Sequence, residues 1–506
     1  VDNSTTVITG DTDKTLTAGD KLFMNNVLNE VLNATGNFVT NTVTDATVVA
    51  SAYDTSGNGG RKLVRLSNGW LVAGTMNGIT RIDFFISKDS GLTWEPFGYL
   101  YNGGISFSAF SIVSANTKIY IIVGGNSGNN VYFCTVETTT FTLGSNIFAI
   151  AQVSIDTNQN AIPSCSLAIN ETETELHACW SSKNPTYPNS YNIRYCKGTI
   201  NEDGSVTWGS VQQLTVNNIT GQDSKNPCII VLSNGLPRIV NEFTTGSSDY
   251  RIICRVFDGT TWTAPSVYGS GTLAYAQFNP CAIFVPQSIN GLANGRIWVT
   301  WHGFDSTDTT YENIRISYSD DGGLTWSPTQ KLTTGNSYKN YYASITADKH
   351  NSIYIIFIGT ESDSGGYLRL KQAKYNGVTW ILSTLTTNNT GQKYYPSTLF
   401  DLSFGLDFSE PLFIYQDYLN SKVGFYGTRT VGEGYTLTMQ NPVTLTDGDK
   451  VPIVDFEVQQ DNQDLELDDI DTEKFVFKGS NLNTDNASIK VLSKDNKLNA
   501  IAYAVA

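Results

Sequence analysis

Positive charge, histidine and long apolar runs are all scarce in this sequence. Its 506 residues include 32 Lys or Arg against 47 Asp or Glu, a formal net charge of −15. Nucleic-acid binding needs clustered cations to neutralise phosphates, so we expect no nucleic-acid partner. No apolar run reaches the roughly 18 residues that a membrane-spanning helix requires, so we expect no membrane insertion.

Cysteine usage also excludes some classes. The seven cysteines are an odd number and lie inside apolar, strand-like runs, so we interpret them as buried thiols of a protein that folds in a reducing cytoplasm. They form no C-x-x-C pair, and the three histidines have no clustered partners, so we predict no zinc site. The acidic stretch Asp464–Asp471 could offer oxygen ligands to calcium, but it lacks EF-hand spacing. A solvated strand edge is the alternative, and we expect no cofactor.

What the sequence does contain is turn-forming and aromatic residues in a repeated pattern. Two segments, Ser87–Trp94 and Ser319–Trp326, both fit S-x-D-x-G-x-T-W. The Asp can accept backbone N–H bonds in a tight turn, the Gly permits positive φ, and the Trp can wedge between hairpin strands. We therefore assign structural roles to Ser87, Asp89, Gly91, Thr93, Trp94, Ser319, Asp321, Gly323, Thr325 and Trp326.

Weaker copies of the pattern extend it along the chain. Aromatic residues end these segments at Trp94, Phe141, Trp208, Trp262, Trp326 and Trp380, which suggests one segment per unit of a repeat fold. The two full copies resemble the Asp-box, or BNR, repeats of the sialidase superfamily, and the resemblance covers roughly residues 45–430. It implies an all-β fold, a sialidase-like β-propeller built from four-stranded blades.

A second repeated element predicts the innermost strand of each blade. Segments such as Asn226-Pro-Cys, Asn279-Pro-Cys and Tyr395-Pro-Ser each precede an apolar second strand, and seven such strands predict seven blades, with the six blades of the sialidase family as the alternative. The last blade shows three strands, so residues 46–53 could supply its fourth and close the ring.

The ends of the chain follow other patterns. We divide the chain into an N-terminal segment (1–44), the propeller (45–430) and a C-terminal β-rich module (431–506). The apolar spacing between Gly19 and Thr35 predicts a short helix. The Thr-, Asp- and Asn-rich C-terminal module resembles the terminal modules of phage tail proteins.

The residues that a sialidase needs are only partly matched. The resemblance places Arg61 where the family has the first arginine of its carboxylate clamp, and Tyr342 where it has the nucleophile. The family's glutamate falls on Asn226, which cannot take a proton from a phenol at neutral pH, and another clamp arginine falls on Tyr311. The catalytic residues are therefore unknown; if the chain is an enzyme, the candidates are Tyr342, Asp305, Asp308 and Glu312.

The face of the propeller that would carry these residues is also a candidate sugar-binding surface. The loops between second and third strands line the mouth of such propellers, and 181–191 and 303–313 are the longest predicted ones, rich in Tyr and small polar groups. Aromatic faces stack on sugars and amides bond to their hydroxyls. The candidate ligand-binding residues are Arg61, Asn226, Asn279, Tyr341, Tyr342, Tyr395, Tyr187, Tyr191, Asp305 and Tyr311.

Together these patterns favour a carbohydrate-binding, adhesive propeller that recognises cell-surface glycans, with a phage tail or another extracellular particle as its setting. Secretion is the alternative location. An exo-glycosidase with a rearranged site and a structural virion module without ligand are the alternative functions. Other tail or virion chains, or further copies of this chain, are possible partners.

Overall fold

The computed structural model describes side chains within residues 55–427, except at 58, 90, 92, 126–129, 247–248, 269–274, 336, 350, 362–365, 387–391, 401–410 and 419–420. Outside this range it describes the backbone of several strands. The chain divides into two compact units, one of residues 43–427 and one that combines residues 1–42 with 428–506. No helix in the described part of the chain is both long and apolar enough to cross a membrane.

The larger unit is a seven-bladed β-propeller, as the seven inner strands predict. Each blade is an antiparallel sheet whose strands follow the chain outward from the central axis. Blade 1 contains β5 (Leu63–Arg65), β6 (Leu71–Asn77), β7 (Arg81–Ser87) and β8 (Glu95–Tyr101), with β12 (Ser145–Asn146) added in parallel. Blade 2 contains β9 (Phe107–Ala115), β10 (Lys118–Gly125), β11 (Val131–Glu137) and β13 (Gln152–Asp156). The short helix α1 (Ile147–Ala151) lies between β12 and β13.

The next three blades repeat this order. Blade 3 contains β14 (Ala161–Ile169), β15 (Glu175–Asn184), β16 (Tyr187–Ile200), β17 (Val206–Trp208) and β18 (Gln212–Gln213). Blade 4 contains β19 (Gln222–Val231), β20 (Pro237–Thr245), β21 (Tyr250–Phe257), β22 (Trp262–Thr263) and β23 (Ser266–Tyr268). Blade 5 contains β24 (Gln277–Val285), β25 (Arg296–Gly303), β26 (Asn313–Ser319) and β27 (Gln330–Lys331), with helix α2 (Gln287–Asn290) after its first strand.

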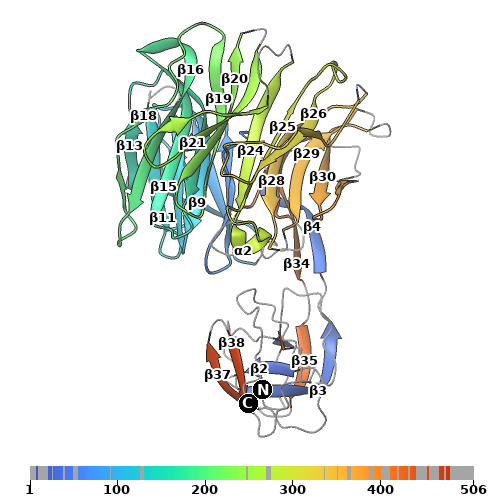
Figure 1. The fold of residues 1–506 in the computed structure, drawn as a ribbon. Helices are drawn as coiled ribbons and strands as arrows, with labels where there is room; N and C mark the ends of the chain where they lie inside the picture. Colours follow the sequence, from blue (N-terminus) through green and yellow to red (C-terminus); the bar gives the residue numbers. More distant parts are fainter. Residues whose placement is uncertain are drawn as a thin grey trace. The chain divides into compact units, whose positions relative to one another are not determined.

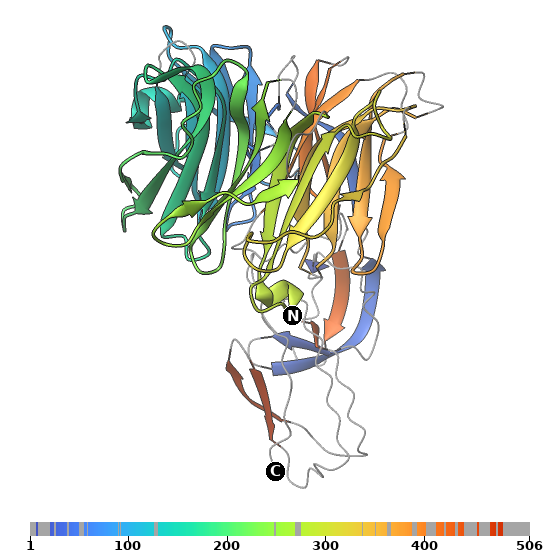
Figure 2. The same ribbon diagram turned by 45° about the horizontal axis from the view of Figure 1, so that its top comes forward.

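The last two blades close the ring. Blade 6 contains β28 (Asn340–Ala347), β29 (Ile353–Gly359), β30 (Arg369–Tyr375) and β31 (Trp380–Thr384). Blade 7 takes β32 (Lys393–Thr398), β33 (Phe413–Asp417) and β34 (Lys422–Thr430) from late in the chain and β4 (Thr40–Val49) from its beginning. The predicted closing strand therefore exists, although it starts before residue 46. Figures 1 and 2 show the blades following one another around a ring.

The core lies between neighbouring blades. The second strand of a blade is packed on both faces, and every residue of β29 is buried. Outer strands alternate between buried and exposed residues or face solvent, as in β31, where Ile381 is 53% exposed. The Trp residues that end the repeats fill the space between blades: Trp380 packs edge-on against Trp298 of blade 5, with ring centroids 6.1 Å apart. Strongly apolar, β-branched second strands thus fix the blade order.

The two matching segments, Ser87–Trp94 and Ser319–Trp326, form equivalent turns between third and fourth strands. Asp89 accepts hydrogen bonds from Ser87 Oγ and from the backbone N–H of Thr93, at 2.8 and 2.9 Å. Asp321 accepts the same bonds from Ser319 and Thr325, at 2.7 and 2.9 Å. These hydrogen bonds lower the pKa of both carboxyls even though burial opposes the change. Both aspartates therefore hold turns on the face away from the loops between second and third strands.

The predicted N-terminal helix is wrong. Residues 21–24 and 27–37 form strands β2 (Lys21–Met24) and β3 (Val27–Asn37), which pair with one another. Pairs of neighbouring apolar residues fit both the 3.6-residue period of a helix and the two-residue period of a strand. The Val, Thr and Asn of this segment disfavour a helix. A five-stranded sheet combines β2 and β3 with β1 (Val7–Ile8), β35 (Gly434–Met439) and β36 (Ile453–Val454), so the two ends of the chain share one sheet. A separate hairpin pairs β37 (Glu466–Asp471) with β38 (Lys474–Lys478).

Gly91 tests the packing at the closure. Its φ is +91°, and a Cβ there would overlap the ring of Phe425 on β34, whereas Gly377 has φ +92° and nothing within 4 Å of such a Cβ. Both alanine variants pay the same left-handed strain, so we expect Gly91→Ala to lose about 1–3 kcal/mol more unfolding free energy than Gly377→Ala. Urea denaturation of the two variants measures the difference. Equal losses would show that blade 7 does not pack tightly on this turn.

Candidate functional site

The inner strands of blades 3 to 7 share a kink at which one extra residue is inserted relative to the second strand. Strand register shifts by one residue between first and second strands in blades 3 to 7, for example between Lys225 and Cys228 in blade 4. The residue at this β-bulge is left-handed in blades 4 to 7, with φ of 46 to 53° for Asn226, Asn279, Tyr342 and Tyr395. Bulges re-aim side chains near functional sites, and a left-handed Tyr is uncommon enough to indicate one.

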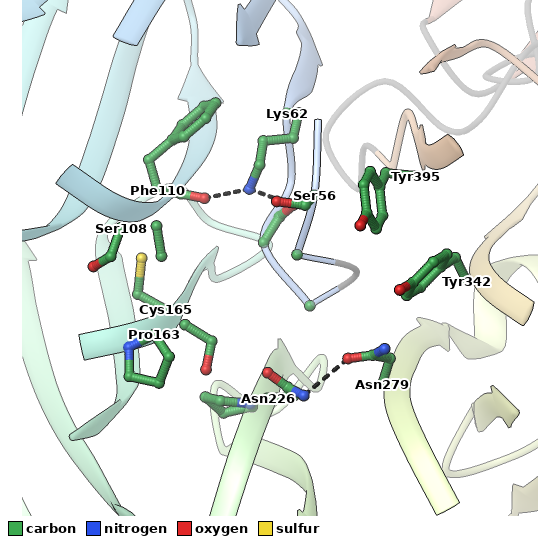
Figure 3. A pocket seen from close by; sticks show the side chains of 16 residues that line it. Ser56, Lys62, Ser108, Phe110, Pro163, Cys165, Asn226, Asn279, Tyr342 and Tyr395 are labelled. Atoms are coloured by element: carbon green, nitrogen blue, oxygen red, sulfur yellow. Dashed lines mark hydrogen bonds between the residues drawn. The ribbon is translucent and has the colours of Figure 1, made fainter. Parts of the chain in front are cut away.

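These four side chains line one pocket, shown in Figure 3. Its volume is about 220 Å³. The remaining lining comes from three glycines and two polar residues of the segment before β5 and from the kinks of blades 2, 3 and 4; these residues are Ser56, Gly57, Gly59, Gly60, Lys62, Ser108, Ala109, Phe110, Pro163, Ser164, Cys165 and Pro227. The sequence thus placed Asn226, Asn279, Tyr342 and Tyr395 together, but it did not find the glycine-rich wall.

The two asparagines are joined to each other and to a carboxyl group behind them. Asn226 Nδ2 donates to Asn279 Oδ1 at 2.8 Å. Glu242, on the second strand of blade 4, accepts the backbone N–H of Asn279 at 3.0 Å, and the Asn226 side chain lies near enough to favour its ionised form. Burial raises the pKa of the Glu242 carboxyl, although the bonds from Asn279 and Asn226 and the charge of Lys225 act against this. Sequence reasoning missed Glu242 because its contact crosses from blade 4 to blade 5.

The two tyrosines belong to a continuous run of aromatic rings. Tyr342 lies 4.5 Å from Tyr395 and 4.7 Å from Tyr341 between ring centroids, and Figure 3 shows both Tyr342 and Tyr395 pointing toward the cavity. Tyr341 itself lies behind Tyr342, where burial raises the pKa of its phenol. His302, 4% exposed, accepts the backbone N–H of Tyr342 on Nδ1 at 3.3 Å. A neutral imidazole therefore supports the strained backbone of Tyr342.

Arg61 and Lys62 point in different directions. The Arg61 guanidinium donates to the carbonyls of Ala282 and Ile345, at 2.9 and 3.4 Å, and does not line the pocket. It therefore ties the inner strands of blades 1, 5 and 6 together. Lys62 does line the pocket, but its ammonium donates to the carbonyls of Gly60 and Phe110 and lies 4.3 Å from the centroid of the Phe110 ring.

The predicted long loop at 181–191 is instead a hairpin. Strands β15 and β16 continue to Asn184 and from Tyr187, so only residues 185–186 connect them. Asn184 stabilises this turn by accepting the N–H groups of Thr186 and Tyr187. Tyr191 lies outside the pocket lining, and its ring is 4.8 Å from the ammonium groups of both Lys183 and Lys225. Polar and Pro residues here were interpreted as a loop, but the hairpin pairing overrides them.

The second predicted loop exists between β25 and β26, and its acids are engaged in holding it. Asp305 pairs with Arg315 at 2.7 Å and with Lys331 at 3.1 Å, and Asp308 also pairs with Lys331 at 3.1 Å. Burial raises the pKa of Asp305, but hydrogen bonds from Thr307, Asp308 and Arg315 outweigh burial and hold this pKa well below its usual range. An acid this firmly ionised is a poor proton donor.

Tyr311 and Glu312 lie on the same loop and are half-buried outside the pocket lining. Lys339 Nζ lies 5.9 Å from the centroid of the Tyr311 ring. Among the described residues, no three His, Cys, Asp or Glu side chains gather as metal ligands. The side chains of the acidic stretch considered for calcium lie outside the described residues.

No protein-family model and no curated protein matches this chain. Similar solved structures include a protein of unknown function from Dyadobacter fermentans, with 11% identity, 79% of this chain and 99% of that chain covered, and a TM-score of 0.43.

Two further similar structures are enzymes. Trypanosoma rangeli sialidase, in complex with the inhibitor DANA, has 12% identity and a TM-score of 0.41, with 76% of this chain and 60% of that chain covered. Penicillium chrysogenum α-L-arabinanase, in complex with arabinobiose, has 12% identity and a TM-score of 0.41, with 77% and 98% covered. Identities this low show a shared fold and do not transfer an activity.

His302 predicts how the site responds to acid. Burial, followed by the charge of Arg315, lowers the pKa of His302 to about 3, and burial lowers that of His177 to about 4. A depressed histidine pKa gives stability that is complete above pH 6.5 and is lost as pH falls toward the folded value. Each histidine should therefore remove up to about 1.4 kcal/mol of unfolding free energy per pH unit below pH 6.5.

The His302→Gln variant isolates this contribution. Between pH 6.5 and 5 we expect its unfolding free energy to fall less steeply than that of the parent protein, because only His177 of these two histidines still contributes. Denaturant titrations at half-unit pH steps provide the slopes, and His177→Gln is the matched control. Parallel slopes for parent and His302→Gln would mean that His302 is not buried in its neutral form.

Proposed function

We propose that the propeller is a carbohydrate-binding, adhesive protein that holds a glycan in the central pocket. The observation that supports this most directly is the lining: two amides, two phenol rings and small hydroxyl and backbone groups converge from several blades. Sugars combine apolar C–H faces with many hydroxyls, so a polar-aromatic pocket on a rigid scaffold suits them. The left-handed backbone at four of these positions supports the same proposal.

The chemical nature of the lining favours binding over bond cleavage. Tyr342, the nucleophile candidate, has Asn226 and Asn279 nearby in the pocket, and amides do not exchange protons with a phenol at neutral pH. Asp305 and Asp308 are engaged in ion pairs on a loop. One observation favours the alternative of a rearranged exo-glycosidase: the raised pKa of Glu242, directly behind the asparagines, suits a proton donor.

The proposed setting is a particle that meets cell surfaces, such as a phage tail, where other tail chains or further copies of this chain would be its partners. Seven free, buried cysteines support assembly in a reducing cytoplasm before release. The two turns built by Asp89 and Asp321 support relationship to Asp-box propellers. Secretion is the alternative location. A purely structural virion role is an alternative function, which binding data would test.

A glycan array probed with the purified chain tests the proposal. We expect saturable binding to at least one class of glycan, and we expect Tyr342→Ala and Tyr395→Ala each to weaken it at least tenfold, about 1.4 kcal/mol, because each removes a stacking ring. Tyr101→Ala, a 45% exposed tyrosine on the outer strand of blade 1, is the control and should bind normally. Absence of binding to every glycan would favour the structural role.

Incubation with the bound glycans distinguishes adhesion from hydrolysis. We expect no release of sugar, because the pocket presents amides and phenols to the ligand. Release that disappears in Tyr342→Phe, Asp305→Asn or Glu242→Gln would establish the glycosidase alternative and overturn the adhesive one. Chromatography of reducing ends over several hours gives sufficient sensitivity for a slow enzyme.

A further inference from the structure

We propose that Asn226 and Asn279, oriented by Glu242, select a neutral sugar by recognising two adjacent hydroxyl groups, and that the pocket disfavours acidic sugars. This inference rests on the proposed glycan binding and adds the class of ligand. It assigns Glu242 the role of a positioning residue, since the carboxyl acts on the ligand through the asparagines.

The Glu242 carboxylate sets the direction of both asparagines. The Asn226 side chain lies near this carboxylate and lowers its pKa, and a carboxylate favours the amide nitrogen, Nδ2, over the amide oxygen on its side. The same nitrogen donates its other hydrogen to Asn279 Oδ1 at 2.8 Å. The backbone N–H of Asn279 donates to Glu242 Oε2 at 3.0 Å, which fixes the left-handed residue that carries this side chain.

These bonds leave one acceptor and one donor for a ligand. Asn226 keeps Oδ1 and Asn279 keeps Nδ2, and neither atom has another hydrogen bond within the described part of the chain. Both residues line the pocket. A hydroxyl can donate to Asn226 Oδ1 while its neighbour accepts from Asn279 Nδ2, so two adjacent hydroxyls satisfy the pair together. A ligand carboxylate or sulfate cannot donate, and it would leave Asn226 Oδ1 facing another oxygen.

The charges around the pocket point the same way. Glu242 lies behind the asparagines and carries a negative charge once it ionises. Lys62 is 1% exposed, and its ammonium donates hydrogen bonds to the carbonyls of Gly60 and Phe110. Arg61 is turned toward the carbonyls of Ala282 and Ile345. Lys225, next to Asn226 in the chain, pairs with Asp223 at 2.8 Å. An anionic ligand would therefore meet a carboxylate and cations that already have partners.

The aromatic side of the pocket completes the fit. Tyr342 and Tyr395, with ring centroids 4.5 Å apart, line the pocket together with the asparagines. A neutral pyranose or furanose can place its C–H face on these rings and its hydroxyl edge on the amides. A volume of about 220 Å³ limits the buried part to about one sugar residue, so a terminal unit of a glycan is the expected ligand.

The experiment measures selectivity with matched pairs of glycans. Binding of the full chain is compared for neutral oligosaccharides and for their uronate, sialylated and sulfated counterparts at pH 7 and constant ionic strength. We expect neutral glycans to bind at least tenfold more tightly. Glu242→Gln, which removes the charge and keeps the size, should lower this ratio at least threefold, and Asn226→Asp should weaken neutral binding at least tenfold. Thermal unfolding identifies a variant that has lost its fold.

Two controls separate these effects from changes in net charge. Glu171→Gln and Asn234→Asp alter exposed residues in turns between first and second strands, and both should leave the ratio unchanged. Tighter binding of acidic glycans, or a ratio unaffected by Glu242→Gln in a folded variant, would overturn the inference while glycan binding stands. Failure of every glycan to bind would overturn the proposed function itself.

Discussion

Closure of the ring is the constraint on which the rest of this propeller depends. Each blade is an antiparallel sheet, and an open stack of seven would leave an apolar blade face uncovered at each end. Strand β4, from the beginning of the chain, joins blade 7 beside β34, so that the first and last blades belong to one continuous ring. The contact of Trp94 with Phe425, at 5.5 Å between centroids, packs blade 1 against blade 7. Both unsupported blade faces are thereby buried.

A closed ring can hold strain that a single sheet could not. Four non-glycine residues adopt left-handed backbone at the kinks of adjacent inner strands, and each costs on the order of 1–3 kcal/mol. The surrounding bonds over-determine them: Asn279 is tied to Glu242 of the previous blade, and Tyr342 to His302 of the previous blade. Because these bonds cross from blade to blade, the pocket is preorganised by the same packing that closes the ring. A ligand would meet side chains that are already in place.

The sequence predicted what depends on local period and on repetition. Seven inner strands predicted seven blades, and the aromatic residues from Trp94 to Trp380 marked six of them, because each of these residues follows the third strand of blades 1 to 6. The helix predicted near Val27 failed since two apolar residues in succession fit a helix and a strand alike. The loop predicted at 181–191 failed because pairing between β15 and β16 outweighs the turn preference of Pro185 and Asn184.

The residues of the candidate site also differ in whether the sequence could predict them. Asn226, Asn279, Tyr342 and Tyr395 could be grouped from the sequence because they occupy the same position of successive repeats. Arg61, grouped with them on resemblance, instead donates to the carbonyls of Ala282 and Ile345 and does not line the pocket. Glu242 could not be found, because nothing in linear spacing brings the second strand of blade 4 to the first strand of blade 5. Contacts between blades depend on the three-dimensional arrangement and leave no signal in the spacing of residues along the chain.

The position of Glu242 also explains why an amide pair can replace charged groups in such a pocket. A free asparagine can turn either end toward a ligand, and its two orientations would favour different hydroxyl patterns. A carboxylate beside the Asn226 amide that also accepts the Asn279 backbone N–H disfavours the flipped orientation, so the pair presents one donor and one acceptor in fixed order. The proposed selectivity would combine this hydrogen-bond direction with the negative charge of Glu242. This arrangement is compatible with a protein whose own net charge of −15 would repel acidic glycans at long range.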